Sequence, residues 1–338
     1  MANSLAPVIG VVNEKCVNCH MCISVCPVKY CIDGSGDHVE INHELCIGCG
    51  SCIAACTHEA RVWLDDADAF FEALAKKEKI VAIVAPAVVS SFPDRYLNLN
   101  GYLKAAGVDA CFDVSFGAEL TVHSYLSANP EESKSTIIAQ PCPAIVTYIE
   151  TYHPELIQYL APFDSPMVHT MKMIREFYPQ YANHRIAAIS PCVAKRREFD
   201  ETGLGDFNVT FRSIAKHLNE LEVELNQFPS AEYDGPLSER AVSFSTPGGL
   251  LRTVERTHVA LARATRRVEG PGVIYDYLEK FADTVKAGFS PPLVDCLNCS
   301  AGCNGGPGTL TANKSIDEVE TSVEDRAARH RRNTSNGP

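Results

Sequence analysis

Apolar residues occur in this chain as short continuous runs that alternate with amphipathic segments. The run KIVAIVAPAVV, residues 79–89, is typical of a buried strand. It follows DDADAFFEALAKKE, residues 65–78, in which acids come first and lysines last, as the helix dipole favours. We therefore expect a helix over 65–78 and a buried strand directly after it.

The same order of elements returns three times. STIIAQPCPAIVTYIETY (135–152), RIAAISPCVAKRREF (185–199) and RAVSFSTPGGLLRTVERT (240–257) each predict a strand, a turn and a helix. The turns contain Pro-Cys-Pro, Pro-Cys and Gly-Gly, respectively. Strands that alternate with helices predict an α/β fold with mostly parallel sheets flanked by helices. The loops beyond the strand ends are then the expected binding site.

The end of the chain has a different pattern. SIDEVETSVEDRAARHRRN, residues 315–333, opens with the capping box Ser315-x-x-Glu318 and runs from acidic to basic. It predicts one terminal helix. RNTSNGP, residues 332–338, has the composition of a disordered tail.

Composition limits the kind of protein. With 338 residues the chain is long enough for about two domains. The net charge is −12 and there is no long basic run, which argues against a nucleic-acid partner. No apolar segment reaches the roughly 18 residues that span a membrane, and the start lacks the features of a secretory signal. The expected location is the cytoplasm.

Fifteen cysteines, nine of them in the first 56 residues, change the picture most. Two identical C-x2-C-x2-C-x3-C runs begin at Cys16 and Cys46 and match the bacterial ferredoxin pattern, in which the fourth cysteine of each run binds the other cluster. Zinc sites rarely use this pattern of eight cysteines, so iron–sulfur is the favoured interpretation. The pattern assigns one 4Fe–4S cluster to Cys16, Cys19, Cys22 and Cys56, and a second to Cys46, Cys49, Cys52 and Cys26. Cys31 is left over and is expected to be a small buried residue.

The other candidate ligands lie far apart. Cys142 and Cys192 occupy equivalent strand–helix turns, and VDCLNCSAGCNGGPG (294–308) adds three cysteines and a glycine-rich run. A zinc knuckle in that segment would need a fourth ligand nearby, and none follows Cys303. Two of its cysteines together with Cys142 and Cys192 would instead supply four thiolates for a further cubane. The turn at 247–249 lacks the lysine and spacing of a phosphate loop.

Together these three segments resemble the catalytic domain of FeFe hydrogenases. The family motifs Thr-Ser-Cys-Cys-Pro, Met-Pro-Cys-x-x-Lys and Cys-x3-Cys correspond here to 139–143, 190–195 and 299–303. The resemblance implies a two-cluster ferredoxin-like domain over 1–62, an H-cluster domain over 63–312, and a C-terminal helix and tail over 313–338.

The resemblance also implies the site. The H-cluster, a cubane joined to a diiron centre with CO, cyanide and dithiolate ligands, would be held by Cys142, Cys192, Cys299 and Cys303. Cys303 would bridge to the diiron centre, and Lys195 would donate to a cyanide ligand. Cys296 has no counterpart in the family motif.

The departures from the family concern proton transfer. Pro141 stands where active hydrogenases place the cysteine that relays protons, and 121–126 contain no glutamate for the next steps. Ala87 replaces a serine and Met167 a glutamine. Ser190 and Leu297 replace two methionines that flank the cluster. Glu119, His123 and Tyr125 are weak candidates for another proton route.

Metal ligands without the proton relay resemble the sensory branch of the family. The first hypothesis is therefore a slow hydrogenase, 2H⁺ + 2e⁻ ⇌ H2, with electron relay through two 4Fe–4S clusters and a role in sensing H2 or redox state. The implied partners are a redox protein and a signalling partner. A turnover hydrogenase with another proton path and a non-catalytic iron–sulfur protein without the diiron site are the alternatives.

Overall fold

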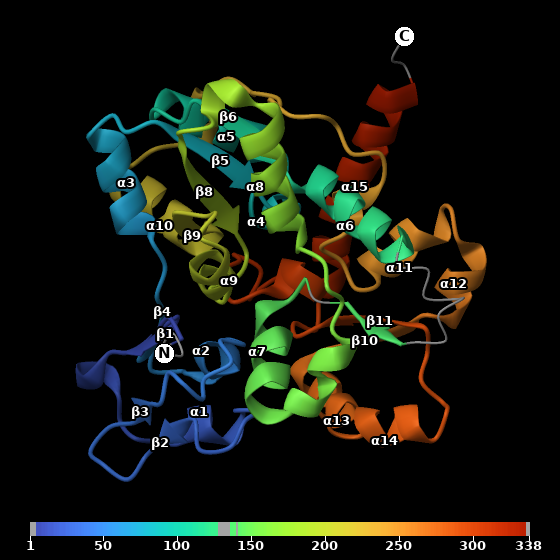
Figure 1. The fold of residues 1–338 in the computed structure, drawn as a ribbon. Helices are drawn as coiled ribbons and strands as arrows, with labels where there is room; N and C mark the ends of the chain where they lie inside the picture. The colour runs from blue at the N-terminus through green and yellow to red at the C-terminus, as the bar shows by residue number, and fades with distance from the viewer. Residues whose placement is uncertain (1–4, 128–135, 140, 336–338) are drawn as a thin grey trace.

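The computed structural model describes residues 5–127, 136–139 and 141–335. The N-terminal part consists of two short helices, each starting within one cysteine run, and two antiparallel strand pairs, β1–β4 and β2–β3 (blue in Figure 1). Its elements are β1 (Ile9–Val11), η1 (Asn13–Lys15), α1 (Met21–Ser24), β2 (Ile32–Asp33), β3 (Glu40–Ile41), α2 (Ser51–Ala55) and β4 (Arg61–Trp63). The repeat in the sequence is therefore a repeat in structure.

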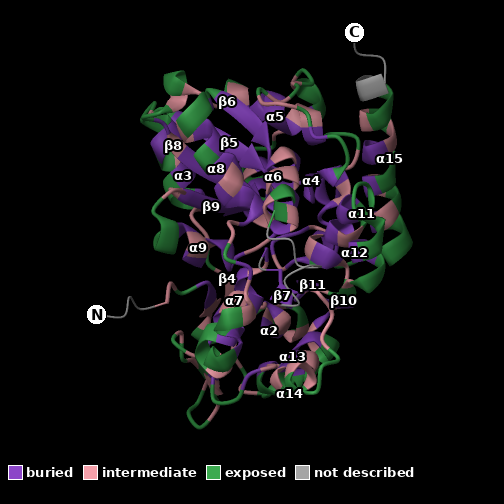
Figure 2. Ribbon diagram, turned by 45° about the vertical axis from the view of Figure 1, so that its right-hand side comes forward, coloured by how far each residue is buried: buried purple, intermediate pink, exposed green. Residues whose placement is uncertain are grey.

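A four-stranded parallel sheet in the order β6-β5-β8-β9 forms the larger core. Its strands are β5 (Ile80–Val84), β6 (Ala110–Asp113), β8 (Arg185–Ser190) and β9 (Phe207–Thr210). They are buried along nearly their whole length, as Figure 2 shows, because helices cover both faces. The elements before, between and after these strands are α3 (Ala67–Ala75), α4 (Val88–Ser91), α5 (Tyr96–Ala105), α6 (Val114–Ser127), α8 (Pro166–Phe177), η3 (Pro179–Tyr181), α9 (Lys195–Thr202), α10 (Phe211–Glu220) and η4 (Leu225–Gln227).

A second parallel sheet, in the order β10-β11-β7, lies nearer the N-terminal part (Figure 1). Its strands are β7 (Ile137–Ile138), β10 (Arg266–Glu269) and β11 (Leu293–Leu297). The elements around it are α7 (Pro143–Tyr152), η2 (Pro154–Tyr159), η5 (Ala241–Ser243), α11 (Gly249–Glu255), α12 (Val259–Ala264), α13 (Pro271–Glu279), α14 (Phe281–Lys286) and η6 (Gly302–Gly305). The predicted α/β fold with parallel sheets is confirmed.

The last helix, α15 (Ile316–Ser335), packs along α4 and η5. Its capping box forms as predicted, since the Ser315 hydroxyl accepts from the Glu318 backbone N–H and the Glu318 carboxylate accepts from that of Ser315. The predicted disorder from residue 332 is wrong up to Ser335, because the helix continues to that residue; 336–338 lie outside the described residues. Within the described chain no helix has the length and apolar character needed to cross a bilayer.

The predicted strand within 240–257 is also wrong. Residues 241–243 form the 3-10 helix η5, and only the helix α11 after the Gly-Gly turn agrees with the prediction. A carboxylate from α6 explains the difference: Oε1 of Glu119 accepts from the backbone N–H groups of Arg240 (2.8 Å) and Ala241 (3.3 Å). These donors need no strand partner.

Candidate metal centres

The first cysteine cavity, of about 310 Å³, lies in the N-terminal part. It is lined by Cys16, Cys19, Cys22 and Cys56, together with Arg61, His20 and His58. Three of these thiols come from the first run and the fourth from the end of the second run, as the ferredoxin spacing predicts. Cys19 is exposed, so this cavity lies at the surface.

The second cysteine cavity, also of about 310 Å³, is lined by Cys26, Cys46, Cys49 and Cys52 within an apolar wall. Cys31 is buried, as predicted, but lines the same cavity. A hydrogen bond from the Cys31 thiol is the main reason why the pKa of Cys46 is lowered to about 6 and that of Cys26 to about 7. This second cavity therefore favours thiolates at two of its four candidate ligands.

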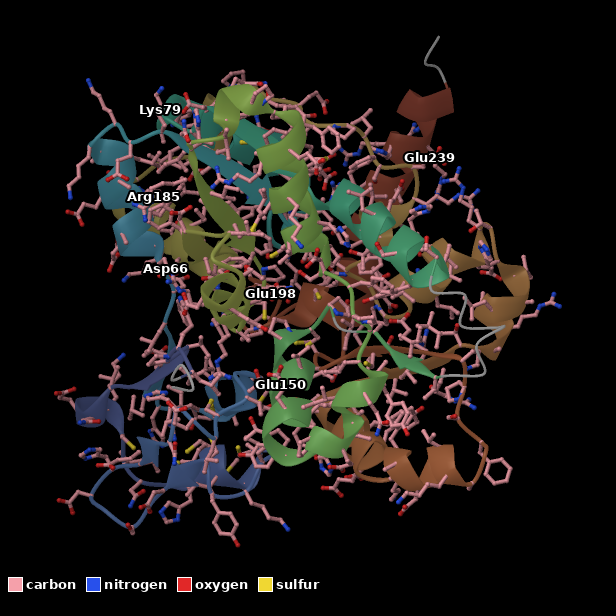
Figure 3. The ribbon with its side chains drawn as sticks, viewed as in Figure 1. Asp66, Lys79, Glu150, Arg185, Glu198 and Glu239 are labelled. Atoms are coloured by element: carbon pink, nitrogen blue, oxygen red, sulfur yellow. The ribbon has the colours of Figure 1, made fainter. Side chains whose placement is uncertain are left out.

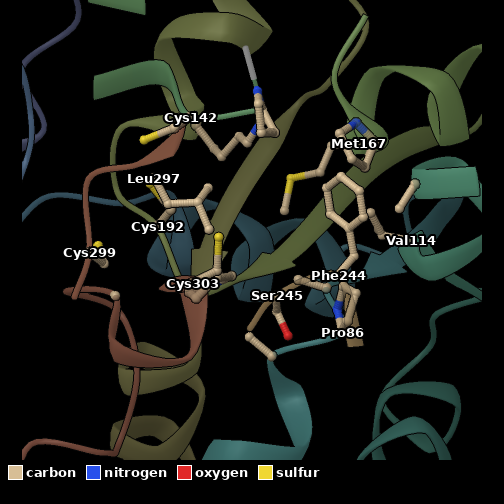
Figure 4. Close-up of a pocket in the computed structure, with 18 of the residues that line it drawn as sticks. Pro86, Val114, Cys142, Met167, Cys192, Phe244, Ser245, Leu297, Cys299 and Cys303 are labelled. Atoms are coloured by element: carbon tan, nitrogen blue, oxygen red, sulfur yellow. The ribbon is translucent and has the colours of Figure 1, made fainter. Parts of the chain in front are cut away.

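The central cavity, of about 760 Å³, lies where the carboxyl ends of the two sheets meet. Cys142 caps α7 after β7, Cys192 lies between β8 and α9, and Cys299 and Cys303 follow β11. All four cysteines line the cavity. In Figure 4 they lie on one side, with Met167, Phe244 and Val114 opposite. Turns that lie from 50 to about 160 residues apart in the sequence thus supply one set of four thiols.

Burial favours the neutral form of these central thiols. It raises the pKa of Cys192 to about 11 and of Cys303 to about 12, and it raises that of Cys299 well above its ordinary value. These cysteines are partly exposed, and their exposed part faces the cavity that they line. Because iron binds thiolates, filling this cavity with an iron–sulfur group must release protons.

Lys195 begins α9 and lines the central cavity. Its side chain is 8% exposed, and Nζ donates to Glu198 Oε2 at 2.6 Å and to Ser165 Oγ at 3.1 Å. Glu198 and Glu150, both labelled in Figure 3, line a separate pocket. The Glu198 carboxylate offsets the cost of burying the ammonium group and fixes its position.

Two glycines, one within the third cysteine motif and one after it, bring backbones together. A Cβ atom on Gly306 would lie 2.5 Å from the Pro191 carbonyl oxygen, and one on Gly302 would meet the Ser245 carbonyl oxygen. The glycines therefore let the Cys303 loop pack directly on the turns that carry Cys192 and Ser245. This packing places the thiols of distant turns around one cavity.

The proton-relay candidates do not meet in this cavity. Pro141 lines it, and so do Ala87, Met167 and Leu297. Glu119 lies away from it and binds backbone N–H groups, His123 is exposed, and Tyr125 is buried against Phe163. Lys195 is the one ionisable group apart from cysteine that lines the cavity among the described residues.

Sequence reasoning missed Ser245 and Asn298, which both line the central cavity. Ser245 is 3% exposed, and its hydroxyl has no hydrogen-bond partner among the described residues. Asn298 lies next to the candidate ligand Cys299 in the sequence, and that position is the signal that could have identified it. Cys296, by contrast, faces the core of the second sheet, where its thiol donates to the Ala139 carbonyl at 3.5 Å.

The second cysteine cavity adjoins the central one. Nδ2 of Asn298 donates to the Cys49 carbonyl at 3.2 Å and lies 3.5 Å from Cys299 Sγ. A Cβ atom on Gly50 would lie 2.5 Å from Pro307 Cβ, so the second cysteine run packs tightly against the central loops. The second cavity therefore lies beside the central one.

The donor chemistry fits iron–sulfur groups. The first and central cavities each offer four cysteines and the second offers five, and the walls of the central and second cavities are otherwise mostly apolar. Such walls exclude water and suit a cluster whose charge is neutralised by thiolate ligation and nearby donors.

Comparisons with known proteins agree with this picture. Residues 78–274 match the family model of the iron-only hydrogenase large subunit, C-terminal domain, and residues 9–57 match that of the 4Fe-4S dicluster domain. The periplasmic Fe hydrogenase large subunit of Nitratidesulfovibrio vulgaris is 26% identical over 366 aligned positions, which cover 88% of this chain and 86% of that protein. The cytosolic Fe-S cluster assembly factor NAR1 of Encephalitozoon cuniculi is 30% identical over 136 residues, 40% of this chain and 33% of that protein.

A solved structure of the FeFe hydrogenase HydA1 from Chlamydomonas reinhardtii has the same fold, with a TM-score of 0.59 and 18% identity. The match covers 77% of this chain and 88% of that chain. The model of the hydrogenase domain spans more than half of the present chain. This chain belongs to the iron-only hydrogenase large-subunit family.

Proposed function

We propose that this protein is a slow FeFe hydrogenase of the sensory type. It would interconvert H2 with two protons and two electrons and pass the electrons through two 4Fe–4S clusters to a redox partner. The observation that supports this proposal most is the central cavity itself: four thiols and Lys195 line it, while Pro141 stands at the usual place of the proton-relay cysteine. Loss of one relay group typically lowers a rate by about 10²–10⁴.

The residues have distinct roles in this proposal. Cys142, Cys192, Cys299 and Cys303 would hold the H-cluster. Its diiron group, when bound, would supply the site at which H2 is split or formed. Lys195, held by Glu198, donates a hydrogen bond and a positive charge to the anionic group in the cavity. Met167, Phe244 and Val114 keep water away from it.

The two N-terminal cysteine cavities are the proposed electron relay. The second cavity, next to Asn298, would hold the cubane that exchanges electrons with the H-cluster, and the first would face the redox partner at the surface. A signalling partner would read the resulting redox state. The cytoplasmic location stays a prediction, and one relative carries the word periplasmic in its name.

The similarity to the assembly factor NAR1 favours one alternative, a non-catalytic iron–sulfur protein without the diiron group. An infrared spectrum after loading with a synthetic diiron cofactor separates the two. We expect bands of CO and cyanide ligands, with the cyanide bands displaced in Lys195→Met. Absence of the bands in protein with full iron content in its 4Fe–4S clusters would rule out the hydrogenase function.

Restoring the missing thiol tests the slow turnover. In diiron-loaded protein we expect Pro141→Cys to raise the rate of H2 evolution by up to about 10², because one relay group is regained. Pro141→Ala removes the same ring without adding a thiol and serves as the control. A wild-type rate that already equals that of Pro141→Cys would favour a turnover hydrogenase with another proton path.

A further inference from the structure

Arg61 is a buried cation at the first cysteine cavity. It is 3% exposed, lines that cavity, and its Nη2 lies 3.0 Å from Cys22 Sγ, to which it donates. Its Nε and Nη1 have no hydrogen-bond partner among the described residues. Three of the five N–H groups of this buried guanidinium therefore lack a partner. Such a group raises the free energy of the folded protein unless an anion lies beside it.

Arg197 is a second buried cation. It lines the pocket between α7 and α9, and Cys46 of the second cysteine cavity lies near it. Arg197 lies on α9, two residues after Lys195, and is 7% exposed. Nε donates to the Ala6 carbonyl at 3.3 Å, while neither Nη has a hydrogen-bond partner among the described residues. The guanidinium group lies within electrostatic reach of Cys46. Helix α9 thus carries one buried cation at the central cavity and another near a thiol of the second cavity.

Carboxylates do not neutralise these arginines directly. Neither Arg61 nor Arg197 forms an ion pair within 4.0 Å in the described part of the chain. Glu44 acts on Arg197 from farther away. In the pocket that Arg197 lines, Glu198 pairs with Lys195 and Asp200 with Arg196. The unpaired positive charge therefore acts mainly on the cysteines.

We propose that Arg61 and Arg197 raise the reduction potentials of the two N-terminal cubanes, one arginine for each. A 4Fe–4S cubane with four thiolate ligands is an anion and gains one more negative charge when it takes up one electron. A buried cation stabilises the reduced form more than the oxidised form, and hydrogen bonds to the sulfur atoms act in the same direction. No bond of the arginine changes in this step.

The consequence concerns the direction of electron flow, and this inference rests on the proposed function. Higher potentials in the relay favour uptake of the electrons that H2 releases in the central cavity. A protein that senses H2 needs a relay that stays reduced while H2 is present. The two arginines therefore suit a sensor better than an enzyme that produces H2.

The test is a redox titration of the full chain with its 4Fe–4S clusters, followed by electron paramagnetic resonance. For Arg61→Gln we expect the reduction equilibrium of one cubane to shift at least tenfold toward the oxidised form, which is about 59 mV for a one-electron couple. Arg197→Gln should shift the other cubane similarly. Arg61→Lys and Arg197→Lys keep the charge and should shift the equilibrium less.

Arg95→Gln is the matched control. Arg95 lies directly before α5, its side chain is 52% exposed, and it pairs with Glu224. It removes the same charge and should leave both potentials unchanged. Unchanged potentials in both Arg→Gln variants with full iron content would overturn the inference, and so would equal shifts in the control. If a Gln variant loses a cluster, the Lys variant at the same position is the deciding measurement. A reduction potential equal to that of the wild type in the Lys variant supports an effect of charge. Loss of the cluster in the Lys variant as well contradicts the inference. Wild-type protein that binds no iron–sulfur clusters would instead contradict the proposed function.

Discussion

At the scale of single residues, the polar groups of the central cavity differ in how well they are satisfied. Lys195 has two partners, whereas the Ser245 hydroxyl has none among the described residues. A buried hydroxyl without a partner costs about 1–3 kcal/mol. The residues around Ser245 do not predict this, because they form a mostly apolar run that resembles a strand. The position of Ser245 became visible only when η5 and the Cys303 loop were placed together.

Ser245→Ala should therefore stabilise protein that lacks the diiron group, by about 1 kcal/mol, because it removes an unsatisfied hydroxyl. We expect a higher midpoint of thermal unfolding, and a smaller gain after diiron loading if the hydroxyl then finds a partner. Ser90→Ala is the control: Ser90 is equally buried, but its hydroxyl donates to the Ala87 carbonyl at 2.8 Å. That variant should lower the midpoint. An equal fall in the midpoint of thermal unfolding in both variants would show that the Ser245 hydroxyl is already hydrogen-bonded.

At the scale of elements, local patterns predicted the helices and strands whose stability is local or follows from burial. The continuous apolar runs became β5 and β8, and the capping box began α15. The pattern failed at 241–243, where Glu119 from a distant helix binds the backbone donors. The amphipathic pattern of α15 also gave no hint that one of its arginines is buried. Both features depend on partners more than a hundred residues away.

That buried arginine predicts how α15 is held. Arg326 is 3% exposed, and its guanidinium group donates to Asp113 Oδ2 at 2.5 Å and to the Pro86 carbonyl at 3.1 Å. Arg326→Ala would leave the Asp113 carboxylate buried without its partner, at a cost of about 3–5 kcal/mol. We expect a much lower midpoint of thermal unfolding and faster proteolysis within α15.

The same helix supplies the control for this prediction. Arg329 pairs with Asp94, but the two side chains are 45% and 82% exposed, so Arg329→Ala should cost less than about 1 kcal/mol. Because Pro86 lines the central cavity, Arg326→Ala should also disturb that wall. Similar midpoints for the two variants would mean that burial of the Arg326 pair does not stabilise α15.

At the scale of the whole molecule, the spacing of cysteines predicted which thiols would share a cavity, since short-range spacing within a repeat limits where each thiol can lie. The same spacing did not predict which N-terminal cavity adjoins the central one, because that depends on how Gly50 and Asn298 pack across the molecule. Nor did it predict Arg61 and Arg197, which a sequence pattern presents as ordinary charged residues. The boundaries 1–62, 63–312 and 313–338 stay predictions.

Asn298 is the residue at which the parts of the proposed relay meet. Its Oδ1 accepts from the Tyr275 hydroxyl at 2.6 Å, while Nδ2 donates to the Cys49 carbonyl and approaches Cys299 Sγ. Asn298→Leu keeps the volume but removes a donor at Cys299, so we expect the potential of the central cubane to fall while that of the first cubane stays unchanged. Tyr275→Phe removes only the hydroxyl and should lower the thermal midpoint with little change in either potential. An equal fall in the potential of the central cubane in both variants would mean that the hydroxyl, rather than the amide donor, controls it.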